Sequence, residues 1–353
     1  MPRYALLLRP SANRVYAGES AALTLAELEV FSSAALDGGI GEIAGAAIGG
    51  VPYVTFEAAD IGERAAAFLA NLSAGYALFE VVGELLRPVT LSGADRYDDD
   101  LITIQKYQGK TNEQFTKLLL NVTVLSSAFA PDMLRRKLAV LDPLCGRGTT
   151  LNQALMYGYD AAGVDLDHKD FEAYSVFIKT WLKRKRLKHR CEYDGPVRRD
   201  GKVVARRLQI TMAATKDAYR SGASQLLDVV NADTARAAQF FRPTSFDALV
   251  TDAPYGIQHG SRSTAKGLAR APLDLLAEAV PVWTTLLRSG GAIGIAWNTL
   301  VARREDAAKV LADSGLELLA DPPYLSFRHR VDQAVMRDIL VARKPLQEGP
   351  IPN

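Results

Sequence analysis

The chain has 353 residues and a mass of 38.3 kDa, with 48% hydrophobic and 23% charged residues. These proportions are typical of a folded globular protein, and they exclude a disordered chain, a collagen and a disulfide scaffold. No apolar run approaches the roughly 18 to 20 residues needed to cross a bilayer, and the apolar run within the first ten residues is too short for a secretory signal. We therefore expect a cytoplasmic protein. Two cysteines and four scattered histidines predict no metal site.

The charge is distributed unevenly along the chain. Residues 1–95 contain five arginines, no lysine and eleven acidic residues, a net charge of −6, whereas residues 179–207 contain twelve basic and three acidic residues, a net charge of +9. A basic segment of this density suits a polyanion such as nucleic acid, although a solvated helix end and hairpin would have the same composition. The candidate phosphate contacts are Lys183, Arg184, Lys185, Arg186, Lys188 and Arg190.

The first 95 residues predict a small α+β domain. Apolar runs at 4–8, 40–48, 51–57 and 76–85 alternate with helical patterns at 22–36 and 61–72, in the order β-α-β-β-α-β. This order is that of a ferredoxin-like domain, with Gly-Gly turn signals at 38–39 and 49–50. The polar stretch at 93–100 marks the domain boundary, and residues 96–130 form a linker followed by a helix over 112–128.

Residues 131–345 predict a second, larger α/β domain. Strand-like runs occur at 138–142, 161–165, 228–232, 246–251, 291–297, 316–319 and 334–343, separated by helical segments. This alternation predicts a doubly wound, seven-stranded Rossmann-like sheet that binds ligands at the carboxyl ends of its strands. A basic insertion at about 182–225 contains a hairpin around residues 199–201. Residues 346–353 form a short tail.

A glycine-rich loop lies between the first of these strands and the next helix. The segment Leu-Asp-Pro-Leu-Cys-Gly-Arg-Gly-Thr-Thr-Leu covers residues 141–151, and its glycines allow a tight turn beside free N–H groups of a helix start. It is not a P-loop, and it lacks the third glycine of a nicotinamide-binding fingerprint. Asp165 ends the following strand, where a carboxylate accepts two hydrogen bonds from a ribose diol. The pattern favours an adenosine ligand.

The segment 246–256 is a buried strand that runs into a polar and aromatic corner, Asp252-Ala253-Pro254-Tyr255-Gly256. This corner resembles the catalytic Asp/Asn-Pro-Pro-Tyr motif of enzymes that methylate exocyclic amino nitrogens, and the resemblance implies the same chemistry here. The lone pair of such an amine is delocalised into the ring, so its methylation needs acceptors for the N–H hydrogens and close alignment with the methyl donor. Asp252 supplies such an acceptor. Tyr255 is suited to stack on a base that has been turned out of its helix.

These two segments resemble the Rossmann-like S-adenosylmethionine-dependent amino-methyltransferases. The loop matches their Asp-Pro-x-Cys-Gly-x-Gly-Thr motif, and the corner is similar to their Asp/Asn-Pro-Pro-Tyr motif, with Ala253 in place of a proline. The resemblance implies S-adenosylmethionine as cofactor, Asp165 on its ribose and Asp233 on its adenine. The implied catalytic residues are Asp252, Pro254 and Tyr255. The implied cofactor-binding residues are Lys106, Tyr107, Asp142, Pro143, Leu144, Cys145, Gly146, Gly148, Thr149, Asp165, Leu166 and Asp233.

A second tetrapeptide, Asp321-Pro322-Pro323-Tyr324, matches the consensus corner more closely than residues 252–255 do. It lies late in the domain, where too few residues remain for the strands that should follow a catalytic corner. Two adjacent prolines also suit the end of a strand. We therefore predict a turn without a catalytic role at 321–324.

The element Lys106-Tyr-Gln-Gly-Lys-Thr-Asn precedes the cofactor loop. This order of motifs, together with the closing segments at 329–332 and 337–339, resembles the tRNA guanosine N2-methyltransferases that modify nucleotide 10, although the chain has no evident THUMP domain. The resemblance implies methylation of guanine N2 in tRNA and a nucleic-acid partner. Arg262 and Lys266 are weaker candidates for substrate contact.

Two other classes of function stay open. In the first, the same chemistry acts on an adenine or cytosine amine of DNA, or on a peptide or small molecule. In the second, the protein is a catalytically silent RNA-binding accessory protein that keeps the cofactor fold. Neither the target atom nor the oligomeric state is indicated by the residues.

Overall fold

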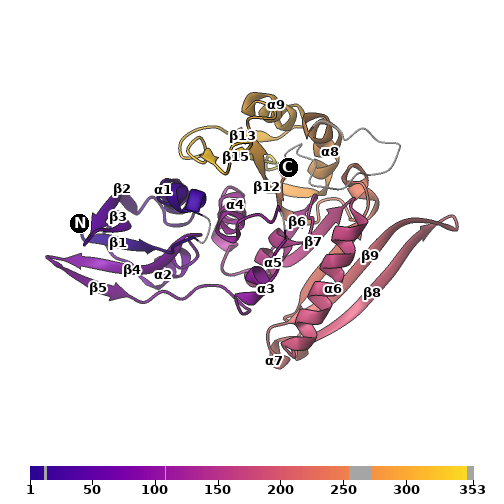
Figure 1. Ribbon diagram of the computed structural model, residues 1–353, viewed down its shortest axis with the longest axis horizontal. Coiled ribbons are helices and arrows are strands. Elements are labelled where there is room, and N and C mark those ends of the chain that lie inside the picture. Colours follow the sequence, from indigo (N-terminus) through magenta and orange to yellow (C-terminus); the bar gives the residue numbers. More distant parts are fainter. Residues whose placement is uncertain (12–13, 108, 254–271, 348–353) are drawn as a thin grey trace, which may run out of the picture.

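The computed structural model describes residues 1–11, 14–107, 109–253 and 272–347, which form two units joined by a polar segment (Figure 1). The N-terminal unit is a five-stranded antiparallel sheet of order β2-β3-β1-β4-β5, with two helices packed on it. Its elements are β1 (Arg3–Leu8), α1 (Arg14–Ala35), β2 (Ile40–Ile48), β3 (Val51–Ala58), α2 (Glu63–Leu69), β4 (Gly75–Val82) and β5 (Leu85–Val89).

The first six of these elements have the predicted order, and two details differ from the expectation. Helix α1 begins at Arg14 instead of residue 22, because its first turns are rich in small and polar residues and carry little amphipathic pattern. Strand β5 was not expected. Among the described strands it pairs with β4 alone, and it contains Pro88, a residue that an edge strand tolerates because one side of it makes no ladder hydrogen bonds.

Between the two units lie α3 (Asp100–Thr103), α4 (Glu113–Leu125) and the 3-10 turn η1 (Ala130–Asp132). The strands of the second unit are β6 (Ala139–Asp142), β7 (Asp160–Asp165), β8 (Lys188–Arg199), β9 (Lys202–Ala213), β10 (Gln225–Asn231), β11 (Phe246–Asp252), β12 (Leu287–Asn298), β13 (Glu317–Leu319), β14 (His329–Arg330) and β15 (Met336–Arg343). Its helices are α5 (Thr149–Met156), α6 (His168–Arg184), α7 (Lys216–Arg220), η2 (Thr234–Gln239), α8 (Pro272–Leu286) and α9 (Arg304–Asp313).

The seven predicted strand segments all form strands, but the sheet is larger than predicted. Nine strands follow the order β13-β15-β12-β11-β6-β7-β10-β9-β8, and β14 pairs with β15, so a sheet of seven strands was wrong. Strands β8 and β9 form the predicted hairpin, which adds to the edge of β10 because an edge strand presents unpaired backbone donors and acceptors. The neighbouring strands from β12 to β10 are parallel, whereas β15 and β9 are antiparallel, so the sheet is mixed.

Two apolar cores cover the two faces of this sheet. Val140 packs into one core and the adjacent Leu141 into the other, as expected when successive side chains of a strand point to opposite faces. Helices α4, α5 and α6 contribute to the first core, and α8 and α9 contribute to the second. Helices on both faces leave the carboxyl ends of the parallel strands accessible for a ligand. Within the described ranges no helix is both long and apolar enough to span a membrane.

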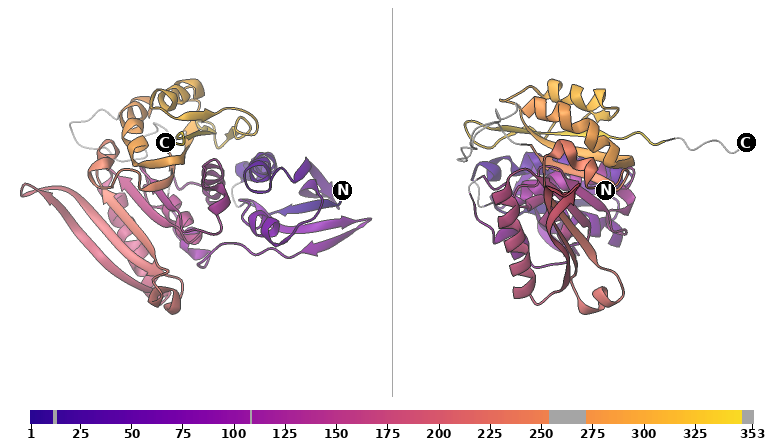
Figure 2. Two further views of the ribbon diagram at one scale, coloured as in Figure 1. Left: turned by 180° about the vertical axis from the view of Figure 1, so that it is seen from behind. Right: turned by 90° about the vertical axis from the view of Figure 1, so that its right-hand side faces the viewer.

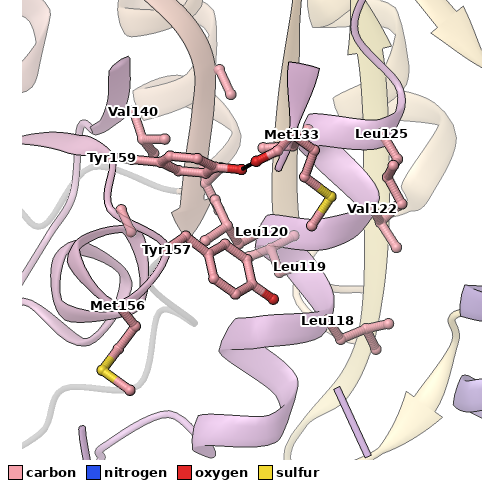
Figure 3. Close-up of a cluster of buried hydrophobic side chains, with 14 of the residues drawn as sticks. Leu118, Leu119, Leu120, Val122, Leu125, Met133, Val140, Met156, Tyr157 and Tyr159 are labelled. Carbon is pink, nitrogen blue, oxygen red and sulfur yellow. Dashed lines mark hydrogen bonds between the residues drawn. The ribbon is translucent and has the colours of Figure 1, made fainter. Parts of the chain in front are cut away.

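Helix α4 joins the two units. Its leucines pack against Met133, Val140 and Tyr157, and the Tyr159 hydroxyl donates to the Met133 carbonyl at 2.6 Å (Figure 3). On the same helix the fully buried Asn121 donates to Glu27 Oε1 (2.7 Å) on α1 and to a backbone carbonyl of the N-terminal unit. Asn121 also accepts from the Tyr157 hydroxyl (2.7 Å). One amide therefore connects both units.

Replacing Asn121 with alanine is expected to lower the free energy of unfolding by about 2 to 4 kcal/mol, because the buried Glu27 carboxylate and the Tyr157 hydroxyl would each lose a partner. Urea denaturation followed by circular dichroism measures this loss. Gln114→Ala, on a more accessible part of the same helix, should cost less than about 1 kcal/mol. Equal losses for the two variants would show that Asn121 does not connect the units.

Candidate active site

The glycine-rich loop follows β6 at the carboxyl edge of the sheet and is fastened to the neighbouring strand β7. The Cys145 N–H donates to the Val164 carbonyl (2.9 Å), and the Gly146 N–H donates to Asp165 Oδ2 (2.7 Å). Helix α5 starts directly after the loop, with Gly148 at its N-cap. The loop residues predicted from the sequence therefore lie beside Asp165, with Pro143 buried and Leu144 half-buried under the turn.

Two glycines permit the close packing of this loop. Gly148 has a φ of +79°, and a Cβ atom there would lie 2.3 Å from the ring of Tyr174, which a side chain cannot tolerate. At Gly163 on β7 a Cβ atom would lie 2.7 Å from Cys145 Sγ. Burial raises the pKa of the Cys145 thiol, so this cysteine acts as a small packing residue and is a poor nucleophile.

Two carboxylates flank the loop: Asp142 is buried and Asp165 is half-buried. Asp142 accepts hydrogen bonds from the Thr251 hydroxyl (2.8 Å) and the Leu144 N–H (3.1 Å), and burial raises its pKa to about 7. Asp165 also accepts from the Asp167 N–H (2.7 Å), and burial raises its pKa to about 6. Desolvation disfavours the charged form of a carboxyl group, and carboxyl groups with pKa values raised in this way cluster at functional sites.

The pKa of Asp142 leads to a prediction on stability. A carboxyl group whose pKa is raised in the folded state destabilises the fold at any pH above its ordinary pKa, and this penalty reaches its full size above the folded pKa. In cofactor-free protein, Asp142→Asn should therefore raise the free energy of unfolding at pH 8 by about 2 to 4 kcal/mol. The difference from the wild type should shrink as the pH falls below 7 and approach zero near pH 4, the ordinary pKa of an aspartate. Thermal unfolding across this range tests it, and a constant difference would contradict the raised pKa.

Strand β10, beside β7, carries at its carboxyl end the side chains that we expect near an adenine ring. Asn231 ends β10 opposite Asp165, and its amide donates to the carbonyls of Asp165 (2.9 Å) and Leu166 (3.1 Å). Asp233 follows and caps η2 by accepting from the Ala235 N–H (3.0 Å). The Leu166 side chain is 72% exposed beside them. The predicted Asp165, Leu166 and Asp233 therefore occur together.

The predicted catalytic Asp252 ends β11, next to the loop. Its Oδ2 atom accepts from the Thr111 hydroxyl at 2.6 Å and lies 3.4 Å from a guanidinium nitrogen of Arg337 on β15. Arg337 is buried and stacks on the ring of Phe115, 4.4 Å from its centroid. The carboxylate is thereby held in one orientation at the edge of the sheet. Pro254, Tyr255, Arg262 and Lys266 lie outside the described residues.

The segment 106–112 connects the loop and this corner. The Tyr107 hydroxyl lies 3.1 Å from Thr149 Oγ1, and the Arg147 guanidinium lies over the Tyr107 ring at 4.8 Å, while Lys106 is exposed. Five residues after Lys106, Thr111 contacts Asp252. Thr111 belongs to the Lys-Tyr-x-Gly element predicted from the sequence, but its contact with Asp252 was not predicted. Arg337 was missed as a site residue because no local pattern relates it to Asp252.

The second tetrapeptide forms a turn, as predicted. The Tyr324 N–H donates to the Asp321 carbonyl (2.9 Å), and Asp321 is exposed. The Tyr324 hydroxyl accepts from Ser126 (3.0 Å) at the end of α4. These contacts assign Tyr324 to packing between the turn and α4.

The predicted phosphate contacts do not lie at this edge. Lys188 pairs with Ala213 in the hairpin, and the adjoining Met212 pairs with Gln225, the first residue of β10. The six basic residues at 183–190 therefore lie at the amino edge, about 20 Å from the carboxyl end of β10 at the rise of a strand. Two of them already form ion pairs: Lys185 with Asp98 and Asp100, and Arg190 with Glu192.

Comparison with known proteins indicates the class of domain to which the second unit belongs. Residues 132–291, which include the loop and the corner, match the family model described as the RMKL-like methyltransferase domain. Among curated proteins no match was found.

Solved structures include distant likenesses. A TehB-like SAM-dependent methyltransferase from Corynebacterium glutamicum is 16% identical with a TM-score of 0.34, covering 61% of this chain and 85% of that one. A precorrin-6y C5,15-methyltransferase from Geobacter metallireducens is 14% identical with a TM-score of 0.38, covering 71% and 98%. A 1,6-didemethyltoxoflavin-N1-methyltransferase from Burkholderia thailandensis, with bound S-adenosylhomocysteine, is 15% identical with a TM-score of 0.35, covering 62% and 76%. TM-scores this low do not identify the class of this protein, which is indicated by the match of residues 132–291.

The mixed sheet with helices on both faces, and its glycine-rich loop, are those of a Rossmann-like methyltransferase domain. The protein is a methyltransferase enzyme, and S-adenosylmethionine is its cofactor. The residues of the carboxyl edge fit this cofactor, because the glycine-rich loop packs too closely on its surroundings for a side chain at Gly148, or at Gly163 on β7, and lies beside the Asp165 carboxylate at the end of β7.

Proposed function

We propose that the enzyme transfers the methyl group of S-adenosylmethionine to an exocyclic amine of a nucleic-acid base, with guanine N2 in tRNA as the first target to test. The observation that carries this proposal is the Asp252 carboxylate at the end of β11, held by Thr111 and Arg337 next to the loop. An acceptor fixed in this way suits an amine whose N–H hydrogens must be held during methylation.

Each residue of the edge has a role in this proposal. The cofactor supplies an electrophilic methyl group on a positively charged sulfur when it is bound. Asp165 accepts hydrogen bonds from the ribose hydroxyls, Asp233 lies at the adenine, and the loop from Asp142 to Thr149 encloses the methionine part. Asp252 accepts from the substrate amine, and the Ala253 carbonyl is available as a second acceptor. Pro254 and Tyr255 complete the corner, with Tyr255 stacking on the base.

The N-terminal unit is proposed to be a ferredoxin-like domain that helps to place the substrate. Its sheet order β2-β3-β1-β4 and its two crossing helices support this topology. Its loop after β1 reaches the active-site side of the molecule, since Asn112, the N-cap of α4, donates to Ser11 Oγ at 3.2 Å. Asn112 directly follows Thr111, the partner of Asp252, so a substrate at Asp252 would lie near this loop.

Other targets remain as alternatives to tRNA. A DNA amine, a peptide or a small molecule would be methylated by the same acceptor. The match to a methyltransferase-domain model favours an enzyme over a silent accessory protein. The basic residues 183–190 are still proposed to bind phosphates, but only a substrate long enough to extend from one edge of the sheet to the other would contact both them and Asp252.

One experiment tests the proposal. Methyl-labelled S-adenosylmethionine is offered with the enzyme to separate pools of tRNA, rRNA, DNA and protein, and the labelled pool is digested and its nucleosides or amino acids are identified. We expect label in tRNA as N2-methylguanosine. Label in adenine or cytosine of DNA would keep the chemistry and change the substrate. Label confined to protein, or absent from every pool, would overturn the proposal.

A further inference from the structure

The β8–β9 hairpin extends past the carboxyl edge of the sheet. Asn231, the last residue of β10, pairs with Arg206 on β9, yet β9 begins four residues earlier, at Lys202. The hairpin end, residues 196–205, therefore projects about 13 Å beyond β10, at the rise of an antiparallel strand. It lies at the same edge of the sheet as Asp165 and Asp252, which end β7 and β11, and Asp233, which follows β10. Figures 1 and 2 show the long hairpin standing out from the rest of the sheet.

Four exposed cations gather at this end: Arg198, Arg199, Lys202 and Arg236, here named the tip cluster. Arg199 and Arg236 come from different elements, yet both guanidinium groups donate to the same atom, Gln239 Oε1, at 3.3 and 3.0 Å. Among the described residues neither forms an ion pair with a carboxylate. Two like charges held at one neutral oxygen repel each other, and a bound anion would relieve this repulsion.

The other cations of the hairpin differ from the tip cluster. Arg206 pairs with Glu172 at 3.1 Å, Arg207 with Asp228, and Lys179 on α6 with Asp194 at 2.7 Å. These pairs neutralise the body of the hairpin. Among the described residues Lys188, at the amino edge, also lacks an ion pair with a carboxylate, so the tip cluster is the group of unpaired cations at the hairpin end that lies near the candidate active site, with Asp200 as its acidic neighbour in the turn.

The tip cluster is held in place by packing. Val197 and Val204 pack with Ala205 and Phe240 in the second core, and Arg199 lies 5.8 Å from the centroid of the Phe240 ring. Arg199 also donates to the Gln239 carbonyl. Gln239 is the last residue of η2, and Asp233 caps the start of the same short helix. The tip cluster therefore has a defined position, about 12 Å along η2 from the residue proposed to lie at the adenine.

We propose that the tip cluster binds phosphate groups of the nucleic-acid substrate, beside the adenine end of the cofactor site. This inference rests on the function proposed above and adds which surface receives the substrate. Arginine pairs bind phosphate through several parallel hydrogen bonds, and each phosphate that is neutralised releases counterions. A strand bound here lies on the same edge as Asp252, which the basic residues 183–190 do not.

The test uses a pair of double variants of equal charge change. Arg199→Gln with Arg236→Gln removes two charges from the tip cluster, and Lys216→Gln with Arg220→Gln removes two exposed charges from α7, at the opposite edge of the sheet. The dissociation constant of fluorescein-labelled bulk tRNA is measured over a range of NaCl concentrations, together with KM and kcat for tRNA methylation and the affinity for S-adenosylmethionine.

We expect the tip variant to bind tRNA about tenfold more weakly and to lower the slope of log affinity against log salt by about 1.5. Its KM should rise with little change in kcat, and its cofactor affinity should not change. The inference would be overturned if the tip variant kept the wild-type tRNA affinity and salt slope. It would also be overturned if the opposite-edge variant lost as much tRNA affinity as the tip variant. Neither result would contradict the methylation of tRNA.

If the wild-type enzyme neither binds nor methylates tRNA, the proposed function itself fails and the inference fails with it. Tight binding of a polyglutamate peptide by the wild type, lost in the tip variant, would show that the surface serves an acidic protein and would overturn the nucleic-acid partner. Far-ultraviolet circular dichroism of both double variants confirms that they fold.

Discussion

Replacing Asp252 with alanine is expected to lower the rate of methyl transfer by a factor on the order of 100 or more, the scale seen when one positioned hydrogen-bonding group is removed from a transition state. The affinity for S-adenosylmethionine should be unchanged, because Asp252 ends β11 and is held there by Thr111 and Arg337, which both lie outside the loop at 142–149. Single-turnover kinetics with labelled cofactor measures the first quantity, and calorimetry measures the second.

Asp321→Ala is the matched control for this variant. Asp321 belongs to the tetrapeptide that agrees better with the consensus, but its side chain is exposed in a turn and Tyr324 packs on the end of α4. We expect this variant to keep most of its activity. An essential Asp321 beside a dispensable Asp252 would show that the strand order does not identify the catalytic corner.

The second large effect concerns the cofactor. Asp165→Ala is expected to weaken the binding of S-adenosylmethionine by about 1.5 to 3 kcal/mol, because charged hydrogen bonds to the ribose are lost from a partly buried site. The same change removes the acceptor of the Gly146 N–H, so the glycine-rich loop also loses its fastening to β7. Isothermal titration calorimetry with the folded variant gives the difference in affinity.

Asp167→Ala controls for damage to the surrounding helix. Asp167 caps α6 by accepting from the Lys169 N–H (2.7 Å), so its loss should cost about 1 kcal/mol of stability without changing cofactor affinity. Equal affinities for the wild type and Asp165→Ala would mean that the cofactor does not bind at the end of β7. If both aspartate variants lost affinity for the cofactor, the loss would be due to disruption of the start of α6 and not to removal of the Asp165 carboxylate.

Local pattern was sufficient for much of this protein. Alternating apolar runs predicted seven strands of the large sheet and the order of the first six elements of the N-terminal unit, because the period of buried residues depends on neighbouring positions alone. The glycine-rich loop and the Asp252 corner were predicted for the same reason, since each is one continuous segment at the end of a strand. The turn signal at residues 199–201 likewise predicted the hairpin, although it did not indicate which end of the hairpin faces the site.

Contacts between distant segments were decided by the tertiary structure. Arg337 reaches Asp252 across 85 residues only because β15 inserts antiparallel beside β12, and Arg199 meets Arg236 only because the hairpin folds over η2. The register of β9 on β10 also placed the basic residues 183–190 at the amino edge and the tip cluster at the carboxyl edge. Strand order and register result from packing over the whole sheet, and a local pattern of apolar residues carries no information about them.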